Sequence, residues 1–348
     1  MSLVKGFNDD KMNSVDRVFA VATGLIPDRI PIFPMIDSIP SELFNLSIKQ
    51  YFSSAENLIA GQKKLQDLLN LDYVSNFFYL AIESEIFGMD TLFFERGSPN
   101  TGEPIAKSID YFSNIDIPYL YDHKVYQKTI STTKGLVNLF KAQKPIISVQ
   151  TGPFSFPSLL MGSSAWFESI LINPEKVKDV LDFATKFGIS WAKGHIEAGA
   201  DIIVLVDGLA TATSIPKDMF EELVIPIYQY ISRELKVPLV FYTAGGDIQP
   251  FAELFKKTGV IGVFPSANDD LSEIKKLSNG RYTLFGNLNN LEFEDWPLNF
   301  MEKVVKETIE IGKPNGNFVL ATQHMIPHGV PIGKIGEFIS IALKYAYY

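Results

Sequence analysis

Polar and aromatic side chains follow several apolar runs of this sequence, at the points where those runs end. Two of them, Tyr242 and His324, could exchange protons with a substrate as general acid and base, and the carboxylates Asp207 and Glu83 could do the same. The remaining candidates are groups that could bind a small substrate: Asp37, Tyr79, Gln150, Phe154, Asn287 and Gln323. Hardly any Lys or Arg stands among them, so the set lacks the guanidinium groups that a polyanionic substrate favours. A polar residue at such a point can equally cap a loop, so each candidate alone leaves both roles open.

The composition excludes several classes of protein. The formal net charge of -9 over 348 residues argues against a nucleic-acid or anionic-membrane partner, because no phosphate-neutralising surplus exists. The absence of cysteine excludes disulfides, cysteine-ligated clusters and a thiol nucleophile. No run reaches the ~18 consecutive apolar residues of a membrane span, and the N-terminus lacks the features of a signal peptide. We therefore predict a cytoplasmic protein.

The elements that must position these side chains are apolar runs of about strand length. The runs cover residues 30–37, 73–80, 145–152, 201–207, 237–244, 260–266, 282–287 and 318–324. Most are continuous rather than alternating, which is typical of strands buried on both faces of a parallel sheet. Helix-like stretches accompany them at 53–70, 174–199, 216–235, 247–258, 271–278, 293–311 and 332–347. This alternation predicts a single-domain (β/α)8 TIM barrel over residues 1–348, in which the polar strand ends meet at one mouth.

One connection is too long for an ordinary crossover. Residues 88–143 separate the second run from the third, and they predict an insertion after the second strand, with a hairpin near 90–98 and a helix over 124–141. The glycine-rich turns of dinucleotide and nucleotide binders are absent from the sequence, which disfavours a doubly wound sheet.

Several short motifs give the chain a family resemblance. Pro27-Asp28-Arg29-Ile30-Pro31 precedes the first run, Gly152-Pro153-Phe154 ends the third, and Gly286-Asn287-Leu288 ends the seventh. In this order and spacing they resemble the uroporphyrinogen decarboxylase superfamily, which contains that decarboxylase and the cobalamin-dependent methyltransferases. The resemblance runs from Arg17 to the C-terminus and implies a TIM barrel independently of the strand pattern.

The motifs of the two branches differ, and this chain is closer to the methyltransferases. The decarboxylases carry an arginine-rich segment after the first strand and an aspartate on the second, whereas residues 35–41 here contain no arginine and residues 75–79 no aspartate. Glu83-Ser84-Glu85, followed by Gly88, is similar to an "E-x-E-x-x-G" segment of the methyltransferases. A decarboxylase acting on a tetrapyrrole or another carboxylated substrate, and a non-catalytic relative, stay open as alternatives.

The resemblance also implies a metal site that this chain cannot reproduce. The methyltransferases hold zinc with an "H-x-C" on the fifth strand and a cysteine after the eighth, where this sequence has Tyr242, Ala244 and His324. Three explanations remain. His324 could hold zinc together with the carboxylates of Glu83, Asp207 and Asp247. The enzyme could be metal-free and use Tyr242 and His324 as acid and base, or the site could bind a ligand without catalysis.

The preferred hypothesis is a corrinoid-linked methyltransferase. It would move a methyl group between a small-molecule substrate and a separate corrinoid protein docked over the barrel mouth, because the "D-x-H-x-x-G" motif of a cobalamin module is absent. We expect no tightly bound cofactor, with zinc left open, and a homodimer is compatible with the sequence.

Overall fold

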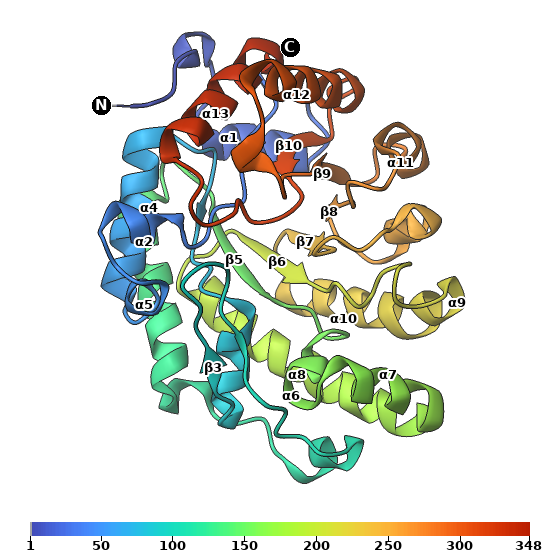
Figure 1. Cartoon of the computed structure of the whole chain (residues 1–348). Helices are drawn as coiled ribbons and strands as arrows, with labels where there is room; N and C mark the ends of the chain where they lie inside the picture. The colour runs from blue at the N-terminus through green and yellow to red at the C-terminus, as the bar shows by residue number, and fades with distance from the viewer. Residues whose placement is uncertain (1) are drawn as a thin grey trace.

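The computed structural model describes residues 2–348, and its centre is one curved sheet of eight parallel strands (Figure 1). The strands are β1 Ile32–Phe33, β2 Val74–Ser75, β5 Ile146–Thr151, β6 Ile202–Val206, β7 Leu239–Tyr242, β8 Gly262–Phe264, β9 Thr283–Leu288 and β10 Phe318–Thr322. Their order is β1-β10-β9-β8-β7-β6-β5-β2, so each strand from β5 to β10 pairs with its neighbour in sequence. The predicted α/β barrel fold is confirmed. β1 and β2 stand at the two ends of the order, where the ring of hydrogen bonds is open.

The first two strands are much shorter than their apolar runs. Pro31 and Pro34 flank β1, and a proline has no N–H to donate to a neighbouring strand. Beyond β2 the backbone turns, because the N–H of Phe77 donates to Oγ of Ser75 at 3.1 Å instead of to a strand. An apolar run therefore predicted the place of each strand but not its length.

Helices cover the outer face of the sheet (Figure 1). They are α1 Ser14–Ala22, α2 Ile39–Leu43, α3 Ile48–Tyr51, α4 Ala55–Leu69, α5 Lys124–Phe140, α6 Phe156–Met161, α7 Ser163–Ile172, α8 Pro174–Glu197, α9 Lys217–Met219, α10 Ile225–Leu235, α11 Leu271–Ser278, α12 Leu298–Gly312 and α13 Ile332–Ala346. Several of these helices begin at residues that favour a helix start. The side chain of Ser54 caps α4, that of Asp270 caps α11, and Pro174 is the first residue of α8. None of the helices within residues 2–348 is both long and apolar enough to cross a membrane.

The helix predicted over residues 247–258 is wrong. The chain forms two short 3-10 turns there, Gln249–Phe251 and Leu254–Lys257. The carboxylate of Asp269 accepts the backbone N–H groups of Ile248 and Gln249, which fixes how the chain enters this segment.

The predicted insertion lies between β2 and α5. It contains the 3-10 helix η2 Leu80–Phe87, the antiparallel pair β3 Thr91–Leu92 and β4 Asn100–Thr101, and two further 3-10 turns. Beyond the tip of the hairpin, Oγ of Ser98 donates to Oδ2 of Asp37 at 2.7 Å. The insertion therefore reaches the end of β1, on the side of the barrel where the candidate residues lie.

A buried ionic cluster closes the opposite end of the barrel. Asp72, just before β2, receives Nη1 of Arg29 at 2.7 Å and Nη1 of Arg17 at 2.9 Å. Burial by itself would raise the pKa of Asp72, but the two guanidinium groups outweigh it and hold that pKa well below its usual range. Arg17 also bonds Asp28 at 2.8 Å, so the first family-like motif is an anchor of the fold here.

Candidate active site

Four polar residues from neighbouring strands form one connected layer at the barrel mouth. The hydroxyl of Tyr242, at the end of β7, donates to the carbonyl of Gln323 at 2.8 Å. The amide of Gln323 donates to Oγ of Ser266 at 3.2 Å, and the amide of Asn287 on β9 donates to the carbonyl of Ser266 at 2.7 Å. This polar layer brings together three of the predicted residues, Tyr242, Asn287 and Gln323, and adds Ser266.

His324 stands next to the polar layer and is held by its backbone. Its N–H donates to Oδ1 of Asn290 at 2.9 Å, and its carbonyl accepts from Nδ2 of Asn290 at 2.9 Å and from Oγ1 of Thr322 at 3.0 Å. The half-buried imidazole makes no hydrogen bond to any of the described residues 2–348, and burial lowers the pKa of His324. The ring is therefore neutral at pH 7 and free to exchange a proton with a ligand.

Gly245 lets the turn after β7 approach this imidazole. It has a φ of 98°, and a Cβ at this position would lie 2.7 Å from Cε1 of His324. Any other residue here would displace the ring. Neither Gly245 nor Asn290 was predicted from the sequence as a residue of the site. The pair Gly245-Gly246 after an apolar run was a usable signal of close approach, whereas nothing in the sequence marked Asn290 as the residue that clamps His324.

Glu83 is a neutral acid on the β5 side of the barrel. It lies on η2, and its Oε1 accepts the N–H of Thr151, the last residue of β5, at 2.8 Å. Burial raises the pKa of Glu83 to about 8, although the bonds to Thr151 oppose that shift. The carboxyl is therefore protonated at neutral pH. It makes no hydrogen bond to the polar layer or to His324.

Asp207 caps the loop after β5. Its carboxylate accepts the N–H of Ser155 at 2.7 Å, the N–H of Phe154 at 3.3 Å and the hydroxyl of Tyr228 at 3.0 Å. Burial raises its pKa to about 6. Tyr228 belongs to α10, so Asp207 points out of the barrel toward the helices. The structure gives it the capping role that the sequence left open beside the catalytic one.

Two other predicted residues also lie away from the mouth. Gln150 points to the outer face of β5, where its amide donates to the carbonyl of Gly188 on α8 at 2.9 Å. The ring of Phe154 is buried, with its centroid 6.0 Å from that of Trp166. Both hold the third strand and its loop against the helices instead of joining the polar layer.

Asp37 and Tyr79 are separated, although both follow short strands. Burial, and after it the charge of Asp37, raises the pKa of Tyr242. The two oxygens of Asp37 accept from the N–H of Ser38 at 2.5 Å and from Ser98. The hydroxyl of Tyr79 donates instead to Glu85 at 2.8 Å, in a surface pocket between α5 and the insertion.

The residues present do not fit a metal ion. Within residues 2–348, no group of three or more His, Asp or Glu side chains is placed to hold one. The three carboxylates that were predicted to hold zinc together with His324 have other partners. Glu83 bonds Thr151, Asp207 caps the loop after β5, and Asp247 bonds Asn268 at 3.3 Å.

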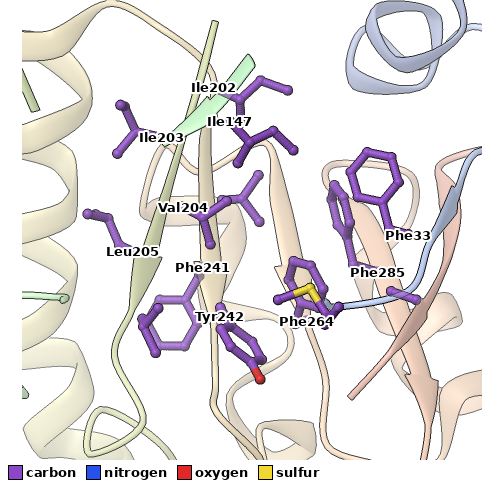
Figure 2. Packing of buried hydrophobic residues seen from close by; sticks show 14 of the residues in the cluster. Phe33, Ile147, Ile202, Ile203, Val204, Leu205, Phe241, Tyr242, Phe264 and Phe285 are labelled. Atoms are coloured by element: carbon purple, nitrogen blue, oxygen red, sulfur yellow. The ribbon is translucent and has the colours of Figure 1, made fainter. Parts of the chain in front are cut away.

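An apolar cavity of about 30 Å³, the axial void, runs inside the barrel below the polar layer. It is lined by Phe33, Met35, Ile36, Tyr73, Ser75, Phe77, Ile147, Val149, Ile202, Val204, Val240, Phe264, Phe285 and Met325. Figure 2 shows Val204 facing the interior together with Phe264 and Phe285, whereas Ile203 and Leu205 point to the other side of β6. The site thus joins an uncharged polar layer and a neutral imidazole to an apolar interior.

The chain is similar to a known protein family, to proteins of known activity and to a solved structure. The family described as Uroporphyrinogen decarboxylase (URO-D) matches residues 13–345. A methylcobamide:CoM methyltransferase MtbA of Methanosarcina acetivorans is 27% identical over 190 residues, which cover 53% of this chain and 55% of that protein. The chain thus spans about half the length of such curated methyltransferases. A uroporphyrinogen decarboxylase of Orientia tsutsugamushi is 23% identical over 99% of this chain and 98% of its own. The solved structure of a methyltransferase from Methanosarcina mazei superposes with a TM-score of 0.84 at 19% identity, covering 96% of this chain and 99% of that one, which shows a shared fold.

Proposed function

The chain belongs to the uroporphyrinogen decarboxylase family, and we propose that within this family it is a methyltransferase-type enzyme. It moves a methyl group between a small substrate and a corrinoid carried by a separate protein that docks over the barrel mouth. The similarity to methylcobamide:CoM methyltransferases supports the reaction class. What this chain lacks, compared with the zinc pattern implied for that branch, is every thiolate ligand.

The observation that carries the proposal is the state of His324. Its imidazole is neutral, has no hydrogen-bond partner among the described residues, and stands beside a polar layer rather than in a salt bridge. A heteroatom held at the polar layer would lie within reach of this ring. Such an arrangement suits proton exchange at an oxygen or sulfur atom that gains or loses a methyl group.

Each residue of the proposed site has one role in methyl transfer. A bound corrinoid supplies or takes up the methyl group. In the methylating direction, a ring nitrogen of His324 accepts the proton of the heteroatom, and the electron pair of that bond stays on the heteroatom to form the new bond to carbon. In the demethylating direction, the ring, which is neutral at pH 7, first takes up a proton from the solvent and then gives it to the heteroatom. Asn290 and Gly245 hold the imidazole in place, and Tyr242 orients the neighbouring backbone through its bond to the Gln323 carbonyl.

A decarboxylase is the second candidate, because the match to the Orientia tsutsugamushi enzyme covers nearly the whole chain. Its substrate would bring carboxylates, which need cationic partners when they are buried. Neither the residues of the polar layer nor those that line the axial void include a Lys or Arg. The methyl-transfer proposal therefore fits the site better.

Replacement of His324 tests the proposal. We expect His324→Ala to abolish methyl transfer to a free reduced corrinoid and from a free methylated corrinoid, followed by the absorbance of the cobalt. Thermal melting should change little, because the ring bonds no described residue. His123→Ala, at the start of α5, is the matched control and should keep full activity. A His324→Ala protein that is as active as the wild type would contradict the assigned role, and release of carbon dioxide without methyl transfer would favour the decarboxylase.

A further inference from the structure

We propose that the surface pocket between α5 and the insertion binds a zwitterionic α-amino acid that has an aromatic side chain. The residues that line this insertion pocket include Lys49, Phe52, Tyr79, Glu85, Phe93 and Lys128. None of its lining residues belongs to the polar layer or to the wall of the axial void. The pocket is therefore a second site, and its ligand is separate from the substrate of the proposed methyl transfer.

Glu85 presents a carboxylate oxygen that has no partner in the protein. The hydroxyl groups of Tyr79 and Thr91 both donate to the same oxygen, Oε1, at 2.8 and 2.6 Å. Within residues 2–348, Oε2 accepts no hydrogen bond, and no Lys, Arg or His forms a salt bridge with the carboxylate. Burial, and after it the charge of Glu85, raises the pKa of Tyr79, so the phenol keeps the proton that orients the carboxylate. The free oxygen can therefore accept a hydrogen bond from an ammonium group of a ligand.

Lys128, on α5, presents an ammonium group that is only partly used. Its Nζ donates to the carbonyl of Phe52 at 3.0 Å and lies 5.0 Å from the centroid of the Phe78 ring, so the charge has a defined place. Among the described residues, no carboxylate forms a salt bridge with it, although Glu85 lines the same pocket. An ammonium group carries three N–H donors, so two remain for a carboxylate of a ligand.

Three aromatic rings form an apolar wall between these charges and the solvent side of the insertion. Tyr79 stands edge-on to Phe52, with ring centroids 5.3 Å apart, and edge-on to Phe93, with ring centroids 5.5 Å apart. Nζ of Lys49 lies 5.9 Å from the centroid of Phe93. Aromatic rings pack favourably against a further ring in edge-to-face or offset geometry. The wall therefore suits an aromatic side chain better than a polar one.

The charges that line the insertion pocket are balanced. Lys49 and Lys128 are its cations, and Glu85 and Asp90 are its anions. A ligand with a single charge would pair with one sign and be repelled by the other, whereas a zwitterion pairs with both. An α-amino acid carries an ammonium group and a carboxylate on one carbon atom, next to its side chain. It therefore matches the free oxygen, the free N–H groups and the aromatic wall together.

Binding of three matched probes to the full chain tests the charge requirement. Titration calorimetry at pH 7 would compare L-phenylalanine, a zwitterion, with 2-phenylethylamine, a cation, and 3-phenylpropionate, an anion. All three carry the same ring. We expect L-phenylalanine to bind at least about tenfold more tightly than either ion. Equal or tighter binding of one of the ions, or no measurable binding of L-phenylalanine, would overturn the proposal.

Two variants of the pocket should change this preference in a crossed pattern. Glu85→Gln keeps an oxygen for Tyr79 but loses the charge, so it should remove the advantage of L-phenylalanine over 3-phenylpropionate and keep the advantage over 2-phenylethylamine. Lys128→Met removes the ammonium group and should do the reverse. A pocket that is merely damaged would lose both advantages.

Matched controls make the same changes outside the pocket. Glu103→Gln, in the insertion, and Lys134→Met, on α5, alter exposed residues that do not line it, and should keep the affinity for L-phenylalanine within about twofold. An unchanged preference in Glu85→Gln or in Lys128→Met would show that the probe lies elsewhere and would refute the proposal. No corrinoid takes part in these titrations, so a failure of methyl transfer would leave the amino-acid site standing.

Discussion

The protonated carboxyl of Glu83 makes the stability of this protein depend on pH in a direction opposite to that of most carboxylates. Its pKa is about 8 in the folded protein and 4.5 in an unfolded chain, and the largest cause is burial. Between these values the folded state holds a proton that the unfolded state has released. Stability is therefore greatest below pH 4.5 for this group, and it falls as pH rises toward 8.

Replacement of Glu83 by Gln isolates this effect. The amide keeps an oxygen for the N–H of Thr151 and cannot ionise. From the two pKa values, linkage gives a loss of about 3 kcal/mol for the wild type between pH 5 and pH 8, and no corresponding loss for Glu83→Gln. The shift of Asp207 has the same sign, but both proteins share it, so it cancels in the comparison.

Urea unfolding at pH 5 and pH 8, followed by tryptophan fluorescence, measures the difference. We expect the free energy of unfolding of Glu83→Gln minus that of the wild type to be about 3 kcal/mol larger at pH 8 than at pH 5, so the variant gains relative stability as pH rises. Glu221→Gln, at an exposed position before α10, is the control and should show a difference below about 0.5 kcal/mol. Equal effects of Glu83→Gln at both pH values would refute the assignment of a buried, protonated carboxyl.

Three further substitutions test the scaffold around the site. Asp72→Asn removes the most buried of the carboxylates that pair with Arg17 and Arg29 and leaves Asp10 as their shared partner, so urea unfolding should show a loss of about 3 kcal/mol. Gly245→Ala forces a methyl group against the imidazole of His324, so methyl transfer should fall at least tenfold while the protein still folds, and unchanged kinetics would contradict the close approach. Asn290→Ala leaves the carbonyl of His324 with fewer donors and should cost roughly 1 to 3 kcal/mol in stability. It should also lower activity, which Asn290→Asp would restore in part by keeping the acceptor for the His324 N–H.

The residues at the strand ends show which side-chain positions sequence patterns can predict and which they cannot. The polar residues at the ends of β7, β9 and β10 were predicted to meet, and they do, because neighbouring parallel strands bring their carboxyl ends to one mouth. Gln150 lies on β5 and Asp207 directly follows β6, yet both side chains bond groups on the helices or on the loop after β5 instead of the polar layer. Successive side chains of a strand face opposite sides of the sheet, so a shift of the strand register by one residue moves a side chain from the barrel interior to the exterior. An apolar run that is two residues longer than its strand does not determine the register.

By itself, the sequence determined the repeating order of buried strands and helices, since continuous apolar runs can be buried only between two layers. It also determined that no thiolate can hold a metal, because the chain has no cysteine. Only the tertiary structure decided which polar groups share a site. The backbone clamp of Asn290 on His324, the approach allowed by Gly245 and the axial void all depend on segments far apart in the chain. Contacts of that kind are set by how strands and loops pack, and no local pattern of residues encodes them.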